Sequence, residues 1–317
     1  MQLLSALVAA GVIPHAFAAD EQVATTFVTG HSAESNFKSV YNNPGLRNSF
    51  FGFLKNVYSI YPPEKFHAMI AEITASNDTD AAIYKELQRR LPEVKSFLQP
   101  VTRALPTLAH QKDVLTSQVG ELTQDHPHAD GYMEIGTTGR YVHGVTKVAG
   151  VKGKIYLLHT ARPQFFSLDD IVDRGQLTRI GKFVDMGDYK QISSDAVPDE
   201  SLDLITNFIG FHHAKPEDRD AFISSVVKKL RPGGRLILRD HDVDSENMRY
   251  IVALAHDVFN AGLDVPLTID EEEVRNFTTV PQIEEALHKQ GMTRTGNKLL
   301  QEGDPTQNTL MLFVKAA

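Results

Sequence analysis

The second half of the chain predicts an α/β fold with a mostly parallel, doubly wound sheet, and the first half predicts an α-helical domain. Six short apolar runs over residues 130–317 are mostly separated by enough chain for a crossover helix, which favours parallel strands covered on both faces. Residues 32–123 instead repeat apolar side chains at helical spacing. The polar stretch TQDHPHADG, residues 123–131, marks the boundary. The six runs are YMEI, KIYLLHT, GKFVDMGD, LDLITNFIGF, GGRLILRD and TLMLFVKA.

Apolar stripes predict the helices of the N-terminal domain. In NSFFGFLKNVYSIYPP, the side chains of Phe50, Leu54, Val57 and Tyr58 fall on one helical face, and the two prolines end the helix. SNDTDAAIYKELQRRL begins with capping residues and continues with a second stripe. The aromatic side chains could line a box for an aromatic substrate, but packing between helices explains them more simply.

The first 19 residues are either a secretory signal or a buried N-terminal helix. Residues 3–13 are apolar, and Ala16 and Ala18 form an A-x-A-like cleavage pair. However, no Lys or Arg precedes the apolar run, and Pro14 and His15 interrupt the approach to the cleavage site. No later run reaches the roughly 18 apolar residues that a membrane-spanning helix needs.

Charge and composition exclude several classes of function. The formal net charge of -8 argues against a general nucleic-acid or anionic-membrane binder, because such proteins depend on basic surface. The chain has no cysteine, which excludes disulfides, thiolate zinc sites and cysteine nucleophiles. Any metal site must therefore use His, Asp or Glu.

The turn in MEIGTTG lies where ligands bind in parallel sheets, directly after the first predicted strand. Gly136 and Gly139 allow a sharp bend in which the backbone approaches a ligand closely, so that a side chain at Gly136 would enter the ligand's space. Glu134 would attract an ammonium rather than a phosphate. Thr138 breaks the G-x-G-x-x-G pattern of dinucleotide sites, which disfavours a nicotinamide dehydrogenase. A purely structural turn remains an alternative.

Four motifs in order resemble those of class I S-adenosylmethionine-dependent methyltransferases. They are MEIGTTG, FVDMGD, VPDESLDLITNFIGFHH and VVKKLRPGGRLILRD, of which the last is the most specific. The terminal TLMLFVKA is similar to the family's antiparallel last strand, paired with MTRTGNKLLQ. The resemblance covers residues 131–317 and implies a Rossmann-like, seven-stranded sheet and S-adenosylmethionine as cofactor.

The resemblance also implies which residues contact the cofactor. Asp188 would lie near the adenine, with Asp185 as the competing acid; strand alternation would instead direct Asp185 toward a packed face. Asn207 and Phe208 would pass beneath the sulfonium. The residues implied around the methionine part are Glu134, Gly136, Thr137 and Gly139, with Thr138 adding a hydroxyl.

The sequence departs from the family at the end of its second predicted strand. The family usually has an acid there that binds both ribose hydroxyls, whereas this chain has His159 and Thr160. Thr160 can still bond a hydroxyl, and Asp169 and Asp170 follow nearby. This departure keeps open a degenerate fold that acts as a non-enzymatic binding or interaction protein.

Polar residues after the fourth and fifth predicted strands are the candidates for catalysis. His212 or His213 could act as a general base, although packing beneath the cofactor explains them as well. Asp240 and His241 could contact the substrate. RDHDVDSEN could hold a divalent metal, but an acidic loop that caps a helix near Ser245 explains it better, so we expect no metal.

We therefore predict a methyltransferase that transfers the methyl group of S-adenosylmethionine to an unidentified acceptor, with a small molecule favoured. The segment 253–279 would form a lid, although its acidic run is more typical of a solvated helix start. Supply of the cofactor favours the cytoplasm, and export through a cleaved N-terminal signal is the alternative. Export would strengthen the interaction-protein hypothesis.

Overall fold

The computed structural model describes residues 34–95, 100–160 and 181–317. The expected signal or N-terminal helix at residues 1–19, and the alternative acids Asp169 and Asp170, lie outside these residues.

The described residues form a seven-stranded sheet with the order β3-β2-β1-β4-β5-β7-β6. Strands β1 to β5 run parallel to one another, and β7 is antiparallel to both β5 and β6. This arrangement confirms the predicted doubly wound sheet, including the antiparallel last strand and its partner. The strands are β1 Ala129–Ile135, β2 Val151–His159, β3 Lys182–Asp185, β4 Leu202–Asn207, β5 Leu230–His241, β6 Met292–Leu300 and β7 Asn308–Lys315.

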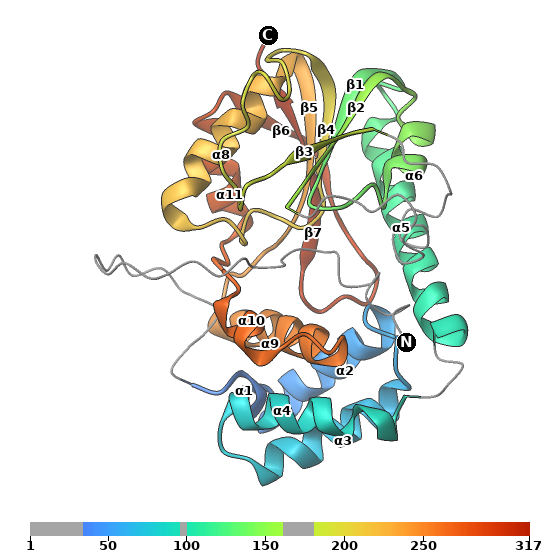
Figure 1. Ribbon diagram of the computed structural model, residues 1–317, viewed down its shortest axis with the longest axis vertical. Coiled ribbons are helices and arrows are strands. Elements are labelled where there is room, and N and C mark those ends of the chain that lie inside the picture. Colours follow the sequence, from blue (N-terminus) through green and yellow to red (C-terminus); the bar gives the residue numbers. More distant parts are fainter. Residues whose placement is uncertain (1–33, 96–99, 161–180) are drawn as a thin grey trace.

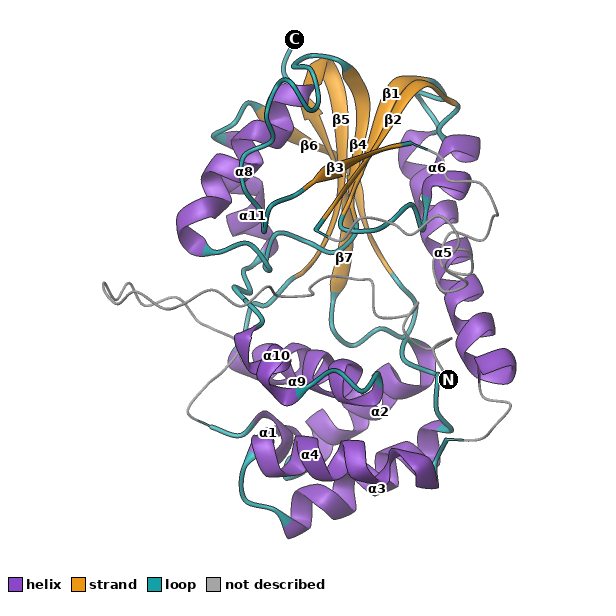
Figure 2. Cartoon of the chain, viewed as in Figure 1, coloured by secondary structure: helices purple, strands orange, loops and turns teal. Residues whose placement is uncertain are grey.

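Helices cover both faces of the sheet, as expected for buried parallel strands. On one face, α5 (Leu105–Thr123) and α6 (Val142–Val148) pack in a core with the inward side chains of β1, β4 and β7. On the other face, α8 (Pro216–Lys229) and α11 (Val280–His288) complete a second core. Figure 2 shows the sheet between these two helical layers.

A separate helical layer lies beyond the carboxyl ends of the parallel strands, at the bottom of Figure 1. It contains α1 to α4 from the N-terminal half and α9 from the second half, which share one hydrophobic core. Tyr61 Oη donates to the carbonyl of Gly262 at 2.6 Å, and Tyr84 Oη donates to that of Val265 at 2.8 Å. The helices are α1 Asn36–Tyr41, α2 Pro44–Asn56, α3 Pro63–Ser76, α4 Asp80–Arg90, α9 Glu246–Gly262 and α10 Leu267–Glu272.

Local capping explains where the helices begin. Ser245 accepts a hydrogen bond from the backbone N–H of Met248 and starts α9, as the sequence predicts. Thr279 and Gln282 form a capping box at α11, and Asn43 caps α2 ahead of Pro44.

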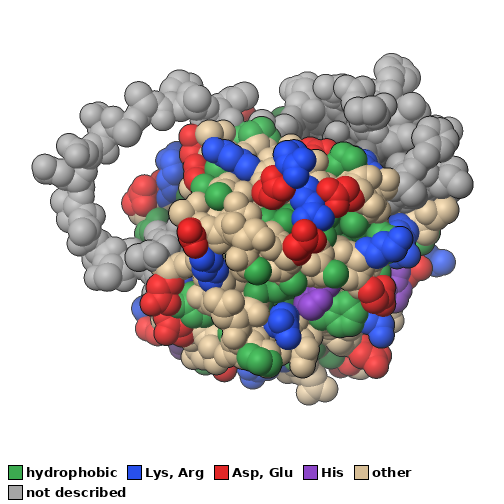
Figure 3. Space-filling model, turned by 90° about the horizontal axis from the view of Figure 1, so that it is seen from below, with side chains coloured by type: hydrophobic (Ala, Val, Ile, Leu, Met, Phe, Trp, Pro, Cys, Tyr) green, Lys and Arg blue, Asp and Glu red, His purple; other side chains and the backbone are tan. Residues whose placement is uncertain are grey.

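The outer face of the helical layer mixes acidic and basic side chains, as Figure 3 shows. Within the described residues, no helix combines the length and the apolar character needed to cross a membrane.

Candidate active site

A cavity lies between the carboxyl ends of the central strands and the helical layer. The glycine turn after β1 contributes Thr137 and Tyr141, and the segment after β4 contributes Phe208 and Ile209. Helix α9 closes the opposite side. The cavity is also lined by Phe53, Val57 and Tyr58 near the end of α2, by His212, His213 and His241, by Ala255, His256, Phe259 and Asn260 of α9, and by Glu273.

The glycine turn is needed for the approach of another loop. Gly136 has φ +87° and Gly139 has φ +107°, conformations that disfavour any side chain. A Cβ at Gly136 would lie 2.2 Å from Cδ1 of Ile209. A side chain there would first meet Ile209, and our expectation that it would enter ligand space stays a prediction.

The carboxylate of Glu134 is buried inside the turn. It accepts hydrogen bonds from Thr137 Oγ1, from Tyr132 Oη at 3.1 Å and from the backbone N–H of Tyr141 at 3.3 Å. Thr137 Oγ1 in turn accepts from the N–H groups of Gly139 and Arg140. Glu134 therefore holds the shape of the turn, while Thr137 reaches the cavity wall.

Asp185 at the end of β3 and Asp188 just beyond it lie at the edge of the sheet, and neither lines this cavity. Asp188 is exposed, with φ +56°, and its carboxylate lies 3.5 Å from Lys215 Nζ. Asp185 is also exposed and accepts a hydrogen bond from Gly187 N at 2.8 Å. The expectation that Asp185 faces a packed side is wrong, because the buried residue of this edge strand is its neighbour Val184, and alternation leaves Asp185 on the exposed face. Thr160 follows β2 and is half-buried.

The two predicted residues at the end of β4 have different surroundings. Asn207 is buried, donates to the carbonyl of Gly210 at 3.0 Å and accepts from Ile209 N at 3.2 Å, so its amide stabilises the turn. The ring of Phe208 meets that of Tyr141 edge-on, with centroids 4.9 Å apart, and lines the cavity. Thr138 is buried in the neighbouring glycine turn.

Asp240 and His212 form a buried pair at the cavity. The Asp240 carboxylate accepts from the backbone N–H groups of Phe211 at 2.7 Å and His241 at 2.9 Å, and lies 2.6 Å from Nδ1 of His212. Burial raises the pKa of Asp240, and the two amide donors oppose this. Burial lowers the pKa of His212, with further lowering by the nearby His213 and His241. His212 is therefore a neutral imidazole whose Nδ1–H is directed at Asp240.

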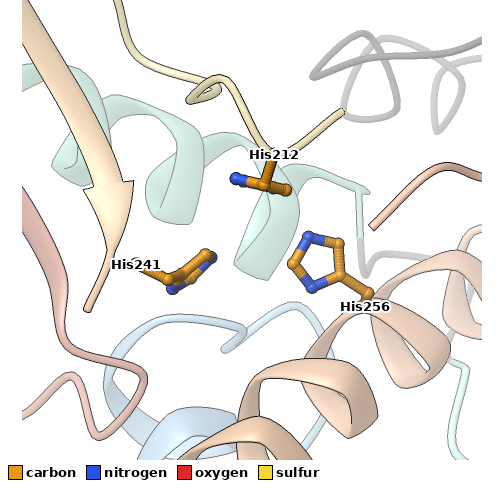
Figure 4. A group of neighbouring side chains, drawn as sticks. All are labelled: His212, His241 and His256. Carbon is orange, nitrogen blue, oxygen red and sulfur yellow. The ribbon is translucent and has the colours of Figure 1, made fainter. Parts of the chain in front are cut away.

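The structure brings all four predicted catalytic residues together and adds a histidine that the sequence did not single out. His256 lies on α9 and faces His212 and His241 (Figure 4). Burial lowers the pKa values of His241 and His256. His213 lies beside His212, 3.6 Å from the carboxylate of Glu273. No local pattern in the sequence singles out His256, because a polar residue is ordinary in an amphipathic helix such as α9.

A buried ion cluster centred on Arg275 supports this wall of the cavity. Its guanidinium binds Asp257, Asp270 at 2.6 Å and Glu273 at 2.8 Å. Burial, followed by the charge of Asp257, raises the pKa of Asp270 to about 6. Burial would also raise the pKa of Glu273, but the charge and the hydrogen bond of Arg275 outweigh it and hold that pKa at about 2. The expectation of a solvated acidic run holds for Glu271 and Glu272, which are exposed, and is wrong for Asp270 and Glu273, which are buried against Arg275.

Residues 175–238, which include β3, β4, α8 and most of β5, match the model of a methyltransferase domain family. The match supports a methyltransferase domain in this part of the chain, and the strand order β3-β2-β1-β4-β5-β7-β6 is that of the α/β methyltransferase fold. No curated protein matches the chain significantly.

Solved structures similar to this chain include several methyltransferases. One is 1,6-didemethyltoxoflavin-N1-methyltransferase of Burkholderia thailandensis with bound 1,6-didemethyltoxoflavin and S-adenosylhomocysteine, at 12% identity over 67% of this chain and 85% of that chain, TM-score 0.43. An O-methyltransferase family 2 protein from Planctomyces limnophilus in complex with apigenin is 13% identical over 79% of this chain and 66% of that chain, TM-score 0.44. The N-methyltransferase NodS of Bradyrhizobium japonicum in complex with S-adenosylhomocysteine is 15% identical over 65% and 87%, TM-score 0.41.

Proposed function

We propose that this protein transfers the methyl group of S-adenosylmethionine to a nucleophilic oxygen or nitrogen of a small molecule held in the cavity. The observation that carries this proposal is that one cavity is lined by both the glycine turn and a buried imidazole. Thr137 and Tyr141 come from the turn, and His212 comes from the segment after β4. The methyltransferase family match includes β4 and most of β5.

Positioning supplies most of the catalysis in this scheme. The acceptor attacks the methyl carbon in line with the sulfur, the carbon–sulfur bond breaks, and its electron pair stays on sulfur as S-adenosylhomocysteine forms. The proton of the acceptor must leave. His212 is the best placed base. Its Nδ1–H donates a hydrogen bond to Asp240, and its Nε2, which would take the proton, has no hydrogen-bond partner among the described residues.

The cavity wall favours an acceptor with an apolar or aromatic body and one ionisable group. Phe53, Tyr58 and Phe259 offer aromatic surface on the side of the helical layer. His212, His213 and His241 lie on the opposite side, near the strand ends, and His256 reaches them from α9. Such a ligand would place its body against the helices and its hydroxyl or amine against His212.

Calorimetric titration of the purified chain tests the cofactor. We expect S-adenosylmethionine and S-adenosylhomocysteine to bind and NAD not to bind, because Thr138 replaces a glycine that a pyrophosphate site needs. Glu134→Gln should weaken binding of S-adenosylhomocysteine at least tenfold, since a neutral amide cannot accept the same set of hydrogen bonds. The matched control is Glu64→Gln at an exposed position of α3, which should bind as the unaltered chain does.

Two results would contradict the proposal. If neither sulfur compound binds, the chain is better explained as a degenerate methyltransferase fold that acts through binding or interaction. If Glu134→Gln keeps its circular dichroism spectrum and full affinity, the turn after β1 is not the cofactor site.

A further inference from the structure

Three histidines at the cavity have the same hydrogen-bonding arrangement. Nδ1 of His212 lies 2.6 Å from the Asp240 carboxylate, Nδ1 of His241 lies 2.9 Å from the carbonyl of Thr306, and Nδ1 of His256 lies 2.9 Å from that of Val252. Each partner is an acceptor, so each Nδ1 carries the proton. In a neutral imidazole this leaves the lone pair on Nε2.

The three rings come from different elements and converge. His212 follows β4, His241 ends β5, and His256 lies on α9. The ring centroids are 5.4 Å apart for His212 and His241, 5.4 Å for His212 and His256, and 5.6 Å for His241 and His256. One ring nitrogen of each lies within 4.8 Å of the other two. Figure 4 shows the rings arranged around a common space.

We propose that His212, His241 and His256 bind one divalent transition-metal ion through their Nε2 atoms. Three imidazoles with one open position are a ligand set of catalytic zinc sites, and imidazole also suits iron, cobalt and nickel. Nitrogens bound at about 2.0–2.1 Å to a tetrahedral ion lie about 3.4 Å apart. Small rotations of the three rings therefore suffice to close the site around the ion.

The surroundings of the rings are those of metal ligands rather than of packed core. Metal-binding histidines usually donate their second ring N–H to a carboxylate or a backbone carbonyl, and all three rings here do so. Nε2 of His212 is buried without a hydrogen-bond partner among the described residues, which is costly for a polar atom unless a ligand satisfies it.

The acids that the sequence offered as metal ligands do not take part. Asp242 accepts a hydrogen bond from the backbone N–H of Val280 at the start of α11, and Asp244 is exposed. Asp240 binds His212 Nδ1 and orients the ring. From the sequence we expect no metal at this loop, and the ligand set proposed here shares only His241 with the residues of that loop.

The role of the ion, unlike its binding, rests on the proposed methyl transfer. All three histidines line the cavity, so the fourth position of the ion would face the acceptor. An acceptor hydroxyl bound there would lose its proton more easily. His212 would then hold the ion and would not take the proton itself.

Metal binding can be tested on the untagged, full-length chain. After dialysis against EDTA, the chain is titrated with Co²⁺ and its visible absorption is followed, and Zn²⁺ is titrated by calorimetry. We expect one ion per chain, with the intense visible bands of Co²⁺ in a low-coordinate nitrogen site. His256→Gln should weaken binding at least tenfold, whereas His288→Gln, at an exposed position of α11, should leave it unchanged.

Three outcomes decide between the hypotheses. Absence of both Co²⁺ bands and Zn²⁺ heat would overturn the metal site. Full metal affinity in His256→Gln would overturn it as well. If the variant does not fold, the Co²⁺ spectrum of the unaltered chain still tests the site. Binding of S-adenosylhomocysteine to the EDTA-treated chain is measured in parallel. If it binds while metal does not, only the metal site is wrong; if metal binds and S-adenosylhomocysteine does not, only the methyltransferase proposal is wrong.

Discussion

Replacing Arg275 by methionine should destabilise the protein strongly. The guanidinium is fully buried, and it is bound by Asp257 on α9, Asp270 on α10 and Glu273 at the cavity. Methionine fills much of the same volume but leaves these three carboxylates without their cation. The substitution therefore tests how much the ion pairs of Arg275 with α9, α10 and the cavity wall stabilise the fold.

The expected loss is about 3–5 kcal/mol in the free energy of unfolding at pH 7, the usual cost of removing one partner from a buried ion pair. The upper part of this range is favoured because three acids lose their partner at once. Protonation limits the cost, so the loss should shrink as the pH falls from 8 to 5. Arg89→Met is the matched control: Arg89 pairs with Glu86 at the surface of α4, and such a pair contributes about 0.3–0.5 kcal/mol.

Urea unfolding followed by circular dichroism measures both variants. Adding Asp257→Asn and Asp270→Asn to Arg275→Met should recover part of the lost stability, because fewer buried charges then remain unpaired. A loss for Arg275→Met within about 1 kcal/mol of that for Arg89→Met would refute the reasoning. It would mean that water reaches the acids or that they are already protonated at pH 7.

Three further predictions concern the cofactor site and the dependence of stability on pH. Asp188→Ala should weaken binding of S-adenosylhomocysteine about tenfold in calorimetric titration, or by about 1.4 kcal/mol. Asp185→Ala should weaken binding less, because the Asp185 carboxylate caps a local turn. A larger loss for Asp185→Ala than for Asp188→Ala would move the adenine site to Asp185. Because the pKa of Asp270 is raised from 3.8 to about 6, the folded chain retains a proton that the unfolded chain loses between about pH 4 and pH 6. The free energy of unfolding should therefore fall as the pH rises through this window, by up to about 3 kcal/mol relative to Asp270→Asn. Urea unfolding of the two proteins at pH 4.5 and pH 7 measures this. An equal change in the free energy of unfolding between the two pH values in both proteins would contradict the prediction. Gly136→Ala should lower the melting temperature and the affinity for S-adenosylhomocysteine, and adding Ile209→Ala should recover part of the affinity. No recovery would mean that backbone strain alone causes the loss, and not the contact with Ile209.

The sheet could be predicted because its signals are local. Each strand is a short apolar run bounded by turn residues, and buried parallel strands require such runs whatever the rest of the chain does. The antiparallel pairing of β6 and β7 came from the resemblance to methyltransferases, not from periodicity, and the structure confirms it.

Part of the site could be predicted for a related reason. His212 follows β4 and Asp240 lies at the end of β5; these strands are neighbours in the sheet, so their carboxyl ends meet at one edge. The position of Asp185 was predicted wrongly because β3 is an edge strand whose buried residue is Val184, so that alternation places Asp185 on the exposed face.

What the sequence by itself determined is the α/β architecture, the order of the motifs and the group of polar residues at the strand ends. Only the tertiary structure decided that α9 packs with helices from the other half of the chain and brings His256 to the two histidines of the strand ends. It also decided that Arg275 gathers acids from separate segments and that Gly136 lies against Ile209. These contacts join residues far apart along the chain, and their partners are selected by packing of whole helices, which leaves no short-range pattern in the sequence.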